Sequence, residues 1–470
     1  MKRTKPHSTL FSLAAIVLFF LFNDEALQAG PVMTKPQIVL STNSILVGDD
    51  FQISITDLPK NTLATIHAQR LSFLYPHGIA WHYSYATFES GERNSINLAR
   101  DQPIDGTYHG ADGLGLFWSM KPMLVDSAIA SLLNRQPRLT AKEHLSTNTI
   151  KFDLEVAGEI VDSKSLVLRT GSQDIIAEPV QEQGLRGLWI HPQATSAKLP
   201  GVLILGGSGG GLRGIQGYAE LVASKGYSVL ALAYFGEETL PRMLAEIPIE
   251  YFQRGLVWLS DQGQADENRL AVIGVSKGAE AALLLASTSK RVRCAVAYAP
   301  SSVVWQGVSN KEVSSWTFDG KPIPFISTAG INSEDLERLK TQERDVAIEW
   351  PPSYYIVKLR PEQAMAARIP VERISCPILL ISGDRDKVWH SSRMGEEIVE
   401  KLRESRFRYQ FNHLMYPYAG HGVMGQGMRP TTSNQWLAGG NAKADAAAQW
   451  DSWHHVLDFL NDNLRSDIQR

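Results

Sequence analysis

The sequence predicts an α/β protein, in which a mostly parallel sheet flanked by helices follows a smaller β-sandwich. From about residue 31 to 175, short runs such as 51–55 and 150–156 alternate apolar and polar residues between turn clusters. From about residue 180 to 470, apolar runs such as 291–299 alternate with helical segments, which is typical of a parallel sheet. A chain of 470 residues is also too long for one ordinary core, so two domains are expected.

The N-terminus has the composition of a secretory signal peptide. Three basic residues lie within the first five positions, an apolar run covers 10–22, and Ala29 offers a small residue for cleavage. The apolar run is short for a membrane span, although an uncleaved anchor is the alternative interpretation. No later stretch approaches a transmembrane helix. We therefore expect residues 1–29 to be removed and the mature chain to be periplasmic or secreted.

The composition excludes several classes of protein. Apolar residues make up 44% and charged residues 20% of the chain, which excludes disordered and collagen-like proteins. The formal net charge is −3 and there is no basic tract, so we expect no nucleic-acid partner. No group of Cys, His or carboxylate residues has metal-ligand spacing, so neither a metal nor another cofactor is expected. The partner is expected to be a small molecule, and the sequence does not indicate the oligomeric state.

The two cysteines, Cys294 and Cys376, each begin an apolar run that is predicted to be a strand. An exported protein could pair them. However, neighbouring parallel strands rarely offer disulfide geometry, which favours buried free thiols.

A candidate nucleophile, Ser276, lies at the centre of a Gly-x-Ser-x-Gly motif. The apolar run 270–275 before it is a predicted strand, and the helix-forming run 279–286 follows it. A serine at such a sharp strand-to-helix turn projects its hydroxyl above the sheet, and the flanking glycines remove Cβ atoms that would clash. The surrounding pattern favours a nucleophile over a chance match to five residues.

A glycine-rich loop, 206–211, opens from another predicted strand at 201–205. Backbone N–H groups in this loop, those of Gly207 and Ser208, can point at a developing oxyanion, and the amide of Lys277 would supply a further donor. The alternative is a phosphate-binding dinucleotide loop. That alternative is disfavoured, because no convincing acidic partner follows and the P-loop lysine is missing.

The acid and the base expected for a serine nucleophile follow in chain order. An apolar run ends at Gly383 and leads into Asp384 and Asp386, and a later run leads into His421, which has glycine on both sides. The order Ser…Asp…His, with each partner just past a strand, is that of the α/β-hydrolases. We prefer Asp386 to Asp384 as the acid, because the bend after Gly383 carries the third residue toward the histidine loop. Either aspartate could instead cap the helix that begins near Ser392.

Between residues 300 and 370 the alternation of strands and helices fails. This irregular stretch contains Trp305, Trp316 and Trp350 and is long enough to form a cap. Its aromatic side chains could line a substrate pocket or simply pack the insertion, and the sequence does not choose between these two roles.

Several long motifs in this order make the chain resemble a known family. They cover residues 105–122, 205–211, 232–235, 240–241, 274–280, 369–373 and 416–421. The chain resembles the acyl-CoA thioesterase and bile acid-CoA:amino acid N-acyltransferase family over nearly all of its predicted exported portion.

The resemblance implies an immunoglobulin-like β-sandwich over 31–175, packed on an α/β-hydrolase catalytic domain over 180–470. It implies a serine hydrolase acting on activated acyl groups, as an acyl-CoA thioesterase does. At the matching positions it places the nucleophile at Ser276, the acid at Asp386 and the base at His421. In this family the hydrolytic branch has serine as nucleophile and the amino-acid-conjugating branch has cysteine, so the serine favours water as acyl acceptor.

Three alternatives remain. The well-known family members are intracellular, whereas this chain is predicted to be exported, so an exported carboxylesterase with a non-CoA substrate is one alternative. An acyltransferase that passes the acyl group to an amine is another. A non-catalytic binding scaffold is the least favoured, because nucleophile, acid, base and oxyanion loop are all present.

Overall fold

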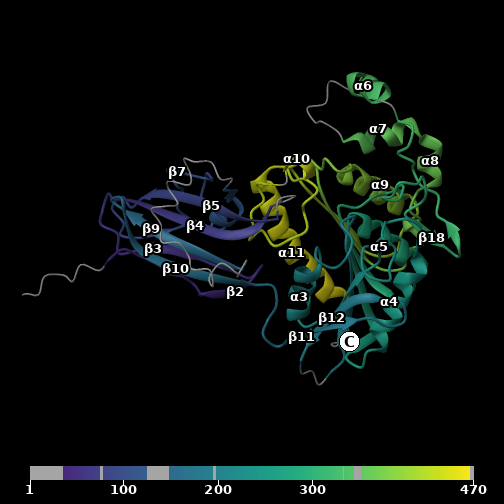
Figure 1. The fold of residues 1–470 in the computed structure, drawn as a ribbon, viewed down its shortest axis with the longest axis horizontal. Helices are drawn as coiled ribbons and strands as arrows, with labels where there is room; N and C mark the ends of the chain where they lie inside the picture. Colours follow the sequence, from purple (N-terminus) through teal and green to yellow (C-terminus); the bar gives the residue numbers. More distant parts are fainter. Residues whose placement is uncertain are drawn as a thin grey trace, which may run out of the picture. The chain divides into compact units, whose positions relative to one another are not determined.

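The computed structural model describes residues 35–74, 78–123, 148–193, 197–331, 333–342, 351–433 and 435–465 (Figure 1). The predicted signal peptide and Trp350 lie outside the described residues. In the part that is described, no helix combines the length and the apolar character needed to cross a membrane.

The N-terminal part of the chain consists of two β-sheets. One has the order β1-β3-β6 and the other the order β2-β10-β9-β4-β5-β7, with β8 also pairing with β5. The pairs are antiparallel except β2 with β10. Their bounds are β1 Gln37–Leu40, β2 Ser44–Leu46, β3 Ile53–Thr56, β4 Leu63–Leu74, β5 Gly78–Glu89, β6 Ile96–Asn97, β7 Asp105–Gly106, β8 Lys121–Pro122, β9 Thr149–Val156 and β10 Glu159–Arg169.

The two sheets share one hydrophobic core. Ile53 and Ile55 of β3 alternate with less buried neighbours, and both lie in the same buried cluster as Ile66 of β4 and Phe152 of β9. The alternation of apolar and polar residues in the sequence therefore corresponds to side chains that point alternately into and away from this core. The short helix α1 (Gly115–Trp118) adds Phe117 to the same cluster.

The C-terminal part contains an eight-stranded sheet with the order β11-β12-β14-β13-β16-β17-β20-β21. The pairs β11–β12 and β12–β14 are antiparallel, and the remaining pairs are parallel. The predicted α/β class with a mostly parallel sheet is thus confirmed. The bounds are β11 Ile175–Val180, β12 Arg186–Pro192, β13 Leu199–Leu205, β14 Ser228–Ala233, β16 Ala265–Val275, β17 Val292–Tyr298, β20 Ile378–Gly383 and β21 Phe411–Tyr416.

Helices cover both faces of this sheet. In Figure 1, α3 (Gln216–Ser224) and α11 (Ala442–Leu464) lie on one side, and α4 (Ile249–Asp261) and α5 (Lys277–Thr288) lie on the other. The side chains of β13 divide accordingly, with those of 203 and 205 in the core under α4 and α5, and those of 202 and 204 in the core under α3 and α11. Strands that are buried on both faces have continuous apolar sequences, and this is why these strands could be predicted from the sequence.

The irregular stretch after β17 forms small elements of its own. Strand β18 (Trp316–Phe318) pairs with β15 (Ile247–Pro248) on one side and with β19 (Lys321–Pro322) on the other. Helices α6 (Ser333–Gln342), α7 (Pro352–Leu359) and α8 (Pro361–Ala366) follow. Trp305 and Trp316 are 5% and 0% exposed and belong to two hydrophobic clusters. Of the two roles left open for these tryptophans, the structure shows packing.

The two cysteines do not form a disulfide. Cys294 and Cys376 are both buried and both free. Burial raises the pKa of each thiol, to about 12 for Cys376, so neither is a ready nucleophile.

Candidate active site

Ser276 occupies the turn between β16 and α5 in a conformation that serine rarely adopts. Its φ is +56° and its ψ is −121°, and its N–H donates to the carbonyl of Tyr298 at 2.9 Å. Strain of this kind persists only where the surroundings impose it, and it clusters at functional sites. The residue is 8% exposed, so it is largely buried.

The two glycines that flank Ser276 are required by close backbone contacts. A Cβ on Gly274 would lie 2.1 Å from the carbonyl oxygen of Gly278. A Cβ on Gly278 would lie 2.4 Å from the carbonyl oxygens of both Gly206 and Leu205. Clashes of added Cβ atoms therefore explain the glycine spacing, as the sequence motif predicts.

The structure brings Asp386 and His421 together. Asp386 follows β20, His421 follows β21, and Nδ1 of His421 lies 2.7 Å from Oδ2 of Asp386. The same oxygen accepts from the hydroxyl of Ser391 at 2.6 Å, and Oδ1 accepts from the N–H groups of Val388 and Trp389 at 2.9 and 3.2 Å. The carboxylate is fixed at both oxygens and is only 2% exposed. The contact with Ser391, the first residue of α9 (Ser391–Glu404), is with its side-chain hydroxyl and not with a backbone N–H of the helix, so it is not the helix cap that the sequence offered as the alternative.

Asp384 has a different position. Its Oδ1 accepts the N–H of Tyr418 at 2.6 Å, so it ties the end of β20 to the loop that carries His421. Between the two aspartates weighed in the sequence, Asp386 is the one that contacts the imidazole, and Asp384 supports the loop.

The histidine loop is held from several sides. The N–H of His421 donates to the carbonyl of Ala438 at 2.8 Å, and its ring meets the ring of Trp389 edge to face at 5.8 Å. The preceding N–H, that of Gly420, donates to Asp445 of α11 at 2.7 Å. Burial raises the pKa of Asp445 to about 7, and the negative charge of Asp386 adds to this effect.

The glycine-rich loop passes beside the candidate nucleophile. A Cβ on Gly207 would lie 3.2 Å from Cβ of Ser276 and 3.7 Å from its Oγ. Ser208 is the next residue of this loop and is exposed. The N–H of Lys277 belongs to the first turn of α5, where backbone N–H groups have no partner four residues earlier and carry partial positive charge. All three predicted oxyanion donors therefore lie on segments that meet at Ser276.

A buried ion pair next to the nucleophile was not identified from the sequence. The ammonium of Lys277 lies 2.9 Å from Glu280 Oε1 and donates to the Ser315 hydroxyl at 2.8 Å, while Glu280 Oε2 accepts from Trp316 Nε1 at 2.9 Å. Burial lowers the pKa of Lys277 and raises that of Glu280, and the charge of each partner opposes the shift. The pair ties the first turn of α5 to the irregular insertion. The sequence signal for this ion pair was a lysine and a glutamate three positions apart in an otherwise apolar helix.

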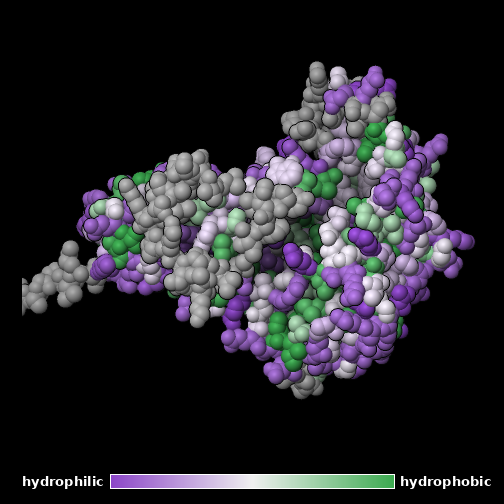
Figure 2. All heavy atoms as spheres, in the orientation of Figure 1, coloured by the Kyte–Doolittle hydropathy of each residue, from purple (hydrophilic) through white to green (hydrophobic). Residues whose placement is uncertain are grey.

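Exposed apolar side chains flank the histidine loop. Tyr418 is 60% exposed, and Trp436 and Leu437, in the short helix α10 (Gln435–Ala438), are 65% and 50% exposed. Hydrophobic residues also reach the surface among polar ones in the face that Figure 2 shows.

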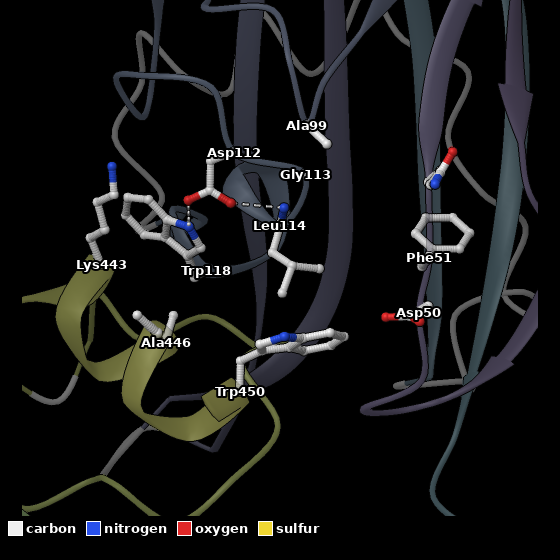
Figure 3. Close-up of a pocket in the computed structure, with 12 residues that line it drawn as sticks. Asp50, Phe51, Ala99, Asp112, Gly113, Leu114, Trp118, Lys443, Ala446 and Trp450 are labelled. Atoms are coloured by element: carbon white, nitrogen blue, oxygen red, sulfur yellow. Dashed lines mark hydrogen bonds between the residues drawn. The ribbon is translucent and has the colours of Figure 1, made fainter. Parts of the chain in front are cut away.

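A separate hollow lies between the N-terminal sheets and α11. It has a volume of about 560 Å³, and Phe51, Leu114, Trp118 and Trp450 line it (Figure 3). The carboxylate of Asp112 at its edge already accepts from Trp118 Nε1 and from the N–H of Leu114. Ser276 does not line this hollow. Within the described ranges, no group of three or more His, Cys and carboxylate residues could hold a metal ion.

The fold and these loops define an α/β-hydrolase, with a serine on the strand-to-helix turn and an aspartate–histidine pair after later strands of the sheet. Residues 48–185 match the acyl-CoA thioester hydrolase/BAAT N-terminal region, and residues 247–466 match the BAAT/acyl-CoA thioester hydrolase C-terminal region. The chain belongs to this family, as its motifs predicted.

Proteins named as acyl-coenzyme A thioesterases and proteins named as amino acid N-acyltransferases are both similar to this chain. Acyl-coenzyme A thioesterase 5 of Mus musculus is 26% identical over 399 residues, which cover 82% of this chain and 87% of the relative. Acyl-coenzyme A amino acid N-acyltransferase 2 of Mus musculus is 25% identical over 446 residues, which cover 91% and 98%. Among solved structures, esterase B from Lactobacillus rhamnosis aligns with a TM-score of 0.38 and 15% identity, covering 64% of this chain and 90% of that chain.

Proposed function

We propose that this protein is a serine acyl hydrolase that cleaves acyl thioesters through an acyl-enzyme on Ser276. One observation carries the assignment of roles, the 2.7 Å contact between His421 Nδ1 and Asp386 Oδ2. These two residues follow adjacent strands of the same sheet in which β16 leads directly into the strained Ser276. The relatives named as acyl-coenzyme A thioesterases support a thioester as the bond that is cleaved.

The reaction proceeds in two halves. The Ser276 hydroxyl attacks the acyl carbonyl and gives its proton to Nε2 of His421, which then protonates the departing thiol. Water attacks the resulting ester, again with His421 as base, and the acid leaves as Ser276 regains its proton. Asp386 holds Nδ1 of the imidazole and stabilises its charged form, and its four donors keep it from rotating away.

Backbone N–H groups stabilise the oxyanion that each half-reaction forms. Gly207 and Ser208 supply one side of the oxyanion hole, and the N–H of Lys277 at the start of α5 supplies the other. The nearness of Gly207 to Ser276 supports this role, because a donor must lie close to the carbonyl that the serine attacks.

Water is the proposed acyl acceptor. The relatives include proteins named as amino acid N-acyltransferases, so transfer to an amine is the second candidate. The nucleophile here is serine, and a serine ester is attacked readily by water when a base is at hand, whereas a thioester acyl-enzyme is more reactive toward amines.

One product analysis tests the reaction and its acceptor. The purified protein is given a series of acyl-CoA thioesters and the matching simple esters, with and without excess glycine or taurine, and products are analysed by mass spectrometry. Free acid as the main product from the thioesters supports the proposal. An N-acyl amino acid as the main product establishes the transferase, and turnover of the simple esters alone establishes a carboxylesterase with a non-CoA substrate.

We also propose that the protein is exported and that its leader is cleaved near Ala29. The basic start and the apolar run 10–22 support this proposal. N-terminal sequencing of the protein from its native source tests it. A mature chain that begins near Gly30 agrees with export, and an intact N-terminus in the cytoplasmic fraction contradicts it.

A further inference from the structure

A buried tyrosine contacts the two peptide groups that begin the glycine-rich loop. Tyr234 directly follows β14 and is 3% exposed. Its hydroxyl donates to the carbonyl oxygen of Gly206 at 2.5 Å, and the carbonyl oxygen of Gly207 lies 3.4 Å from the same hydroxyl. One phenol thus reaches both carbonyl groups of the Gly206-Gly207 pair.

These two carbonyls belong to the peptide units that carry the proposed oxyanion donors. The carbonyl of Gly206 shares a planar peptide unit with the N–H of Gly207, and the carbonyl of Gly207 shares one with the N–H of Ser208. In a trans peptide the C=O and N–H point in opposite directions. A partner that fixes the direction of each carbonyl therefore fixes the direction of the corresponding N–H.

The Gly206 carbonyl is also confined by α5, the helix that follows the nucleophile. A Cβ on Gly278, two residues after Ser276, would lie 2.4 Å from this oxygen. The peptide unit is therefore held between the hydroxyl of Tyr234 and the first turn of α5. The next residue, Phe235, holds the far end of the loop, because its carbonyl accepts the N–H of Gly211 at 3.0 Å.

The hydroxyl of Tyr234 has little freedom to leave this position. Its ring packs against the rings of Phe235, Phe252 and Trp316, with centroids 5.2, 5.3 and 5.7 Å away. Burial raises the pKa of this phenol far above its ordinary range, and the negative charge of Glu280 adds to the shift. Tyr234 therefore stays a neutral hydrogen-bond donor wherever the protein is folded and active.

We propose that Tyr234 is a positioning residue for the oxyanion hole, which holds the Gly206–Gly207 and Gly207–Ser208 peptide units so that their N–H groups face the oxyanion. The inference rests on the proposed function, since it requires an oxyanion beside Ser276. Because the hydroxyl is buried and donates to the loop, we expect its loss to affect the transition state and not substrate binding.

The test compares Tyr234→Phe with a matched variant, Tyr251→Phe. Tyr251 is also buried, at 5% exposure, and its hydroxyl donates to the carbonyl of Ala233 at 2.6 Å, one residue before Tyr234. Each substitution deletes one buried phenolic hydroxyl. Tyr234→Phe removes it from the carbonyls of Gly206 and Gly207, and Tyr251→Phe removes it from the carbonyl of Ala233 and from the N–H of Arg186, which donates to it at 3.2 Å. Only the hydroxyl of Tyr234 touches the loop.

We expect Tyr234→Phe to lower kcat about 10- to 100-fold, less than loss of a direct oxyanion donor, with KM changed less than about twofold. The pH profile should not move. Tyr251→Phe should lower the melting temperature to a similar extent and leave kcat near that of the wild type. A trifluoromethyl ketone that forms an oxyanion adduct with Ser276 should bind more weakly to Tyr234→Phe by the factor lost in kcat/KM.

Three outcomes overturn the inference: an unchanged kcat in Tyr234→Phe, an equal loss of kcat in both variants, or unchanged affinity for the ketone. These outcomes differ from failure of the proposed function. In that case the wild-type protein itself hydrolyses no thioester, and the ketone does not bind at Ser276.

Discussion

His421 Nδ1 lies 2.7 Å from Asp386 Oδ2, although 35 positions separate the two residues in the chain. The contact follows from the sheet, because β20 and β21 are parallel neighbours and Gly383 pairs with Tyr416 at their carboxyl ends. The strand that carries Ser276, β16, ends at the same edge, since Val275 pairs with Tyr298 and Tyr298 pairs with Ile381. Parallel strands thus deliver all three residues to one edge of the sheet.

Removal of the nucleophile or the base should abolish turnover. Ser276→Ala and His421→Ala should each lower kcat about 10⁴-fold or more, and the double variant should be little worse than either, because the residues act as a unit. Steady-state kinetics on one acyl-CoA substrate measures this. Losses that multiply in the double variant would show that the two residues work independently.

The two aspartates should respond differently to the same substitution. Asp386→Asn removes the carboxylate charge beside the imidazole and should lower kcat about 10⁴-fold. Asp384→Asn keeps an oxygen for the N–H of Tyr418, so it should cause only a small loss. A lower kcat in Asp384→Asn than in Asp386→Asn would show that Asp384, and not Asp386, is the catalytic acid.

Gly278 should not tolerate a side chain. Gly278→Ala places a Cβ 2.4 Å from two backbone oxygens, so the helix and the loop must move apart, and we expect a loss of about 3 kcal/mol in unfolding free energy together with loss of activity. Gly422→Ala is the control, because its added Cβ meets nothing within 4 Å although it adjoins His421. Urea unfolding and activity assays on both variants would contradict this account if they gave equal results.

Asp445 should make the stability depend on pH. Burial raises its pKa from 3.8 to about 7, so the folded protein holds this proton more tightly than the unfolded chain. The resulting stabilisation is complete below about pH 4 and is lost as the pH rises to about 7. Asp445→Asn keeps an oxygen for the Gly420 N–H and lacks this titration.

Urea unfolding of Asp445→Asn and of the wild type between pH 4 and pH 8 measures the effect. The free energy of unfolding of the variant, relative to the wild type, should rise with pH up to about pH 7 and then level off. A difference that stays constant over this range would show that Asp445 titrates normally in the fold.

The sequence predicted the parts of the site that follow local rules. Ser276 was recognisable because its turn has a fixed spacing of glycines: a contact within the turn requires Gly274, and the carbonyls of Leu205 and Gly206 require Gly278. The choice between Asp386 and Asp384 could only be a preference, since it depends on which carboxylate the histidine loop contacts. The partners of Lys277 and the role of Tyr234 depend on residues of an irregular insertion and of a separate strand, which no local pattern specifies.

Site-resolved labelling with a fluorophosphonate tests the central claim, that Ser276 is an activated nucleophile. The purified protein is treated with the reagent, and the modified peptide is identified by mass spectrometry. We predict one adduct, on Ser276, loss of thioesterase activity in proportion to labelling, and no adduct in Ser276→Ala or His421→Ala. An adduct on another residue, or hydrolysis that continues in fully labelled protein, would contradict it.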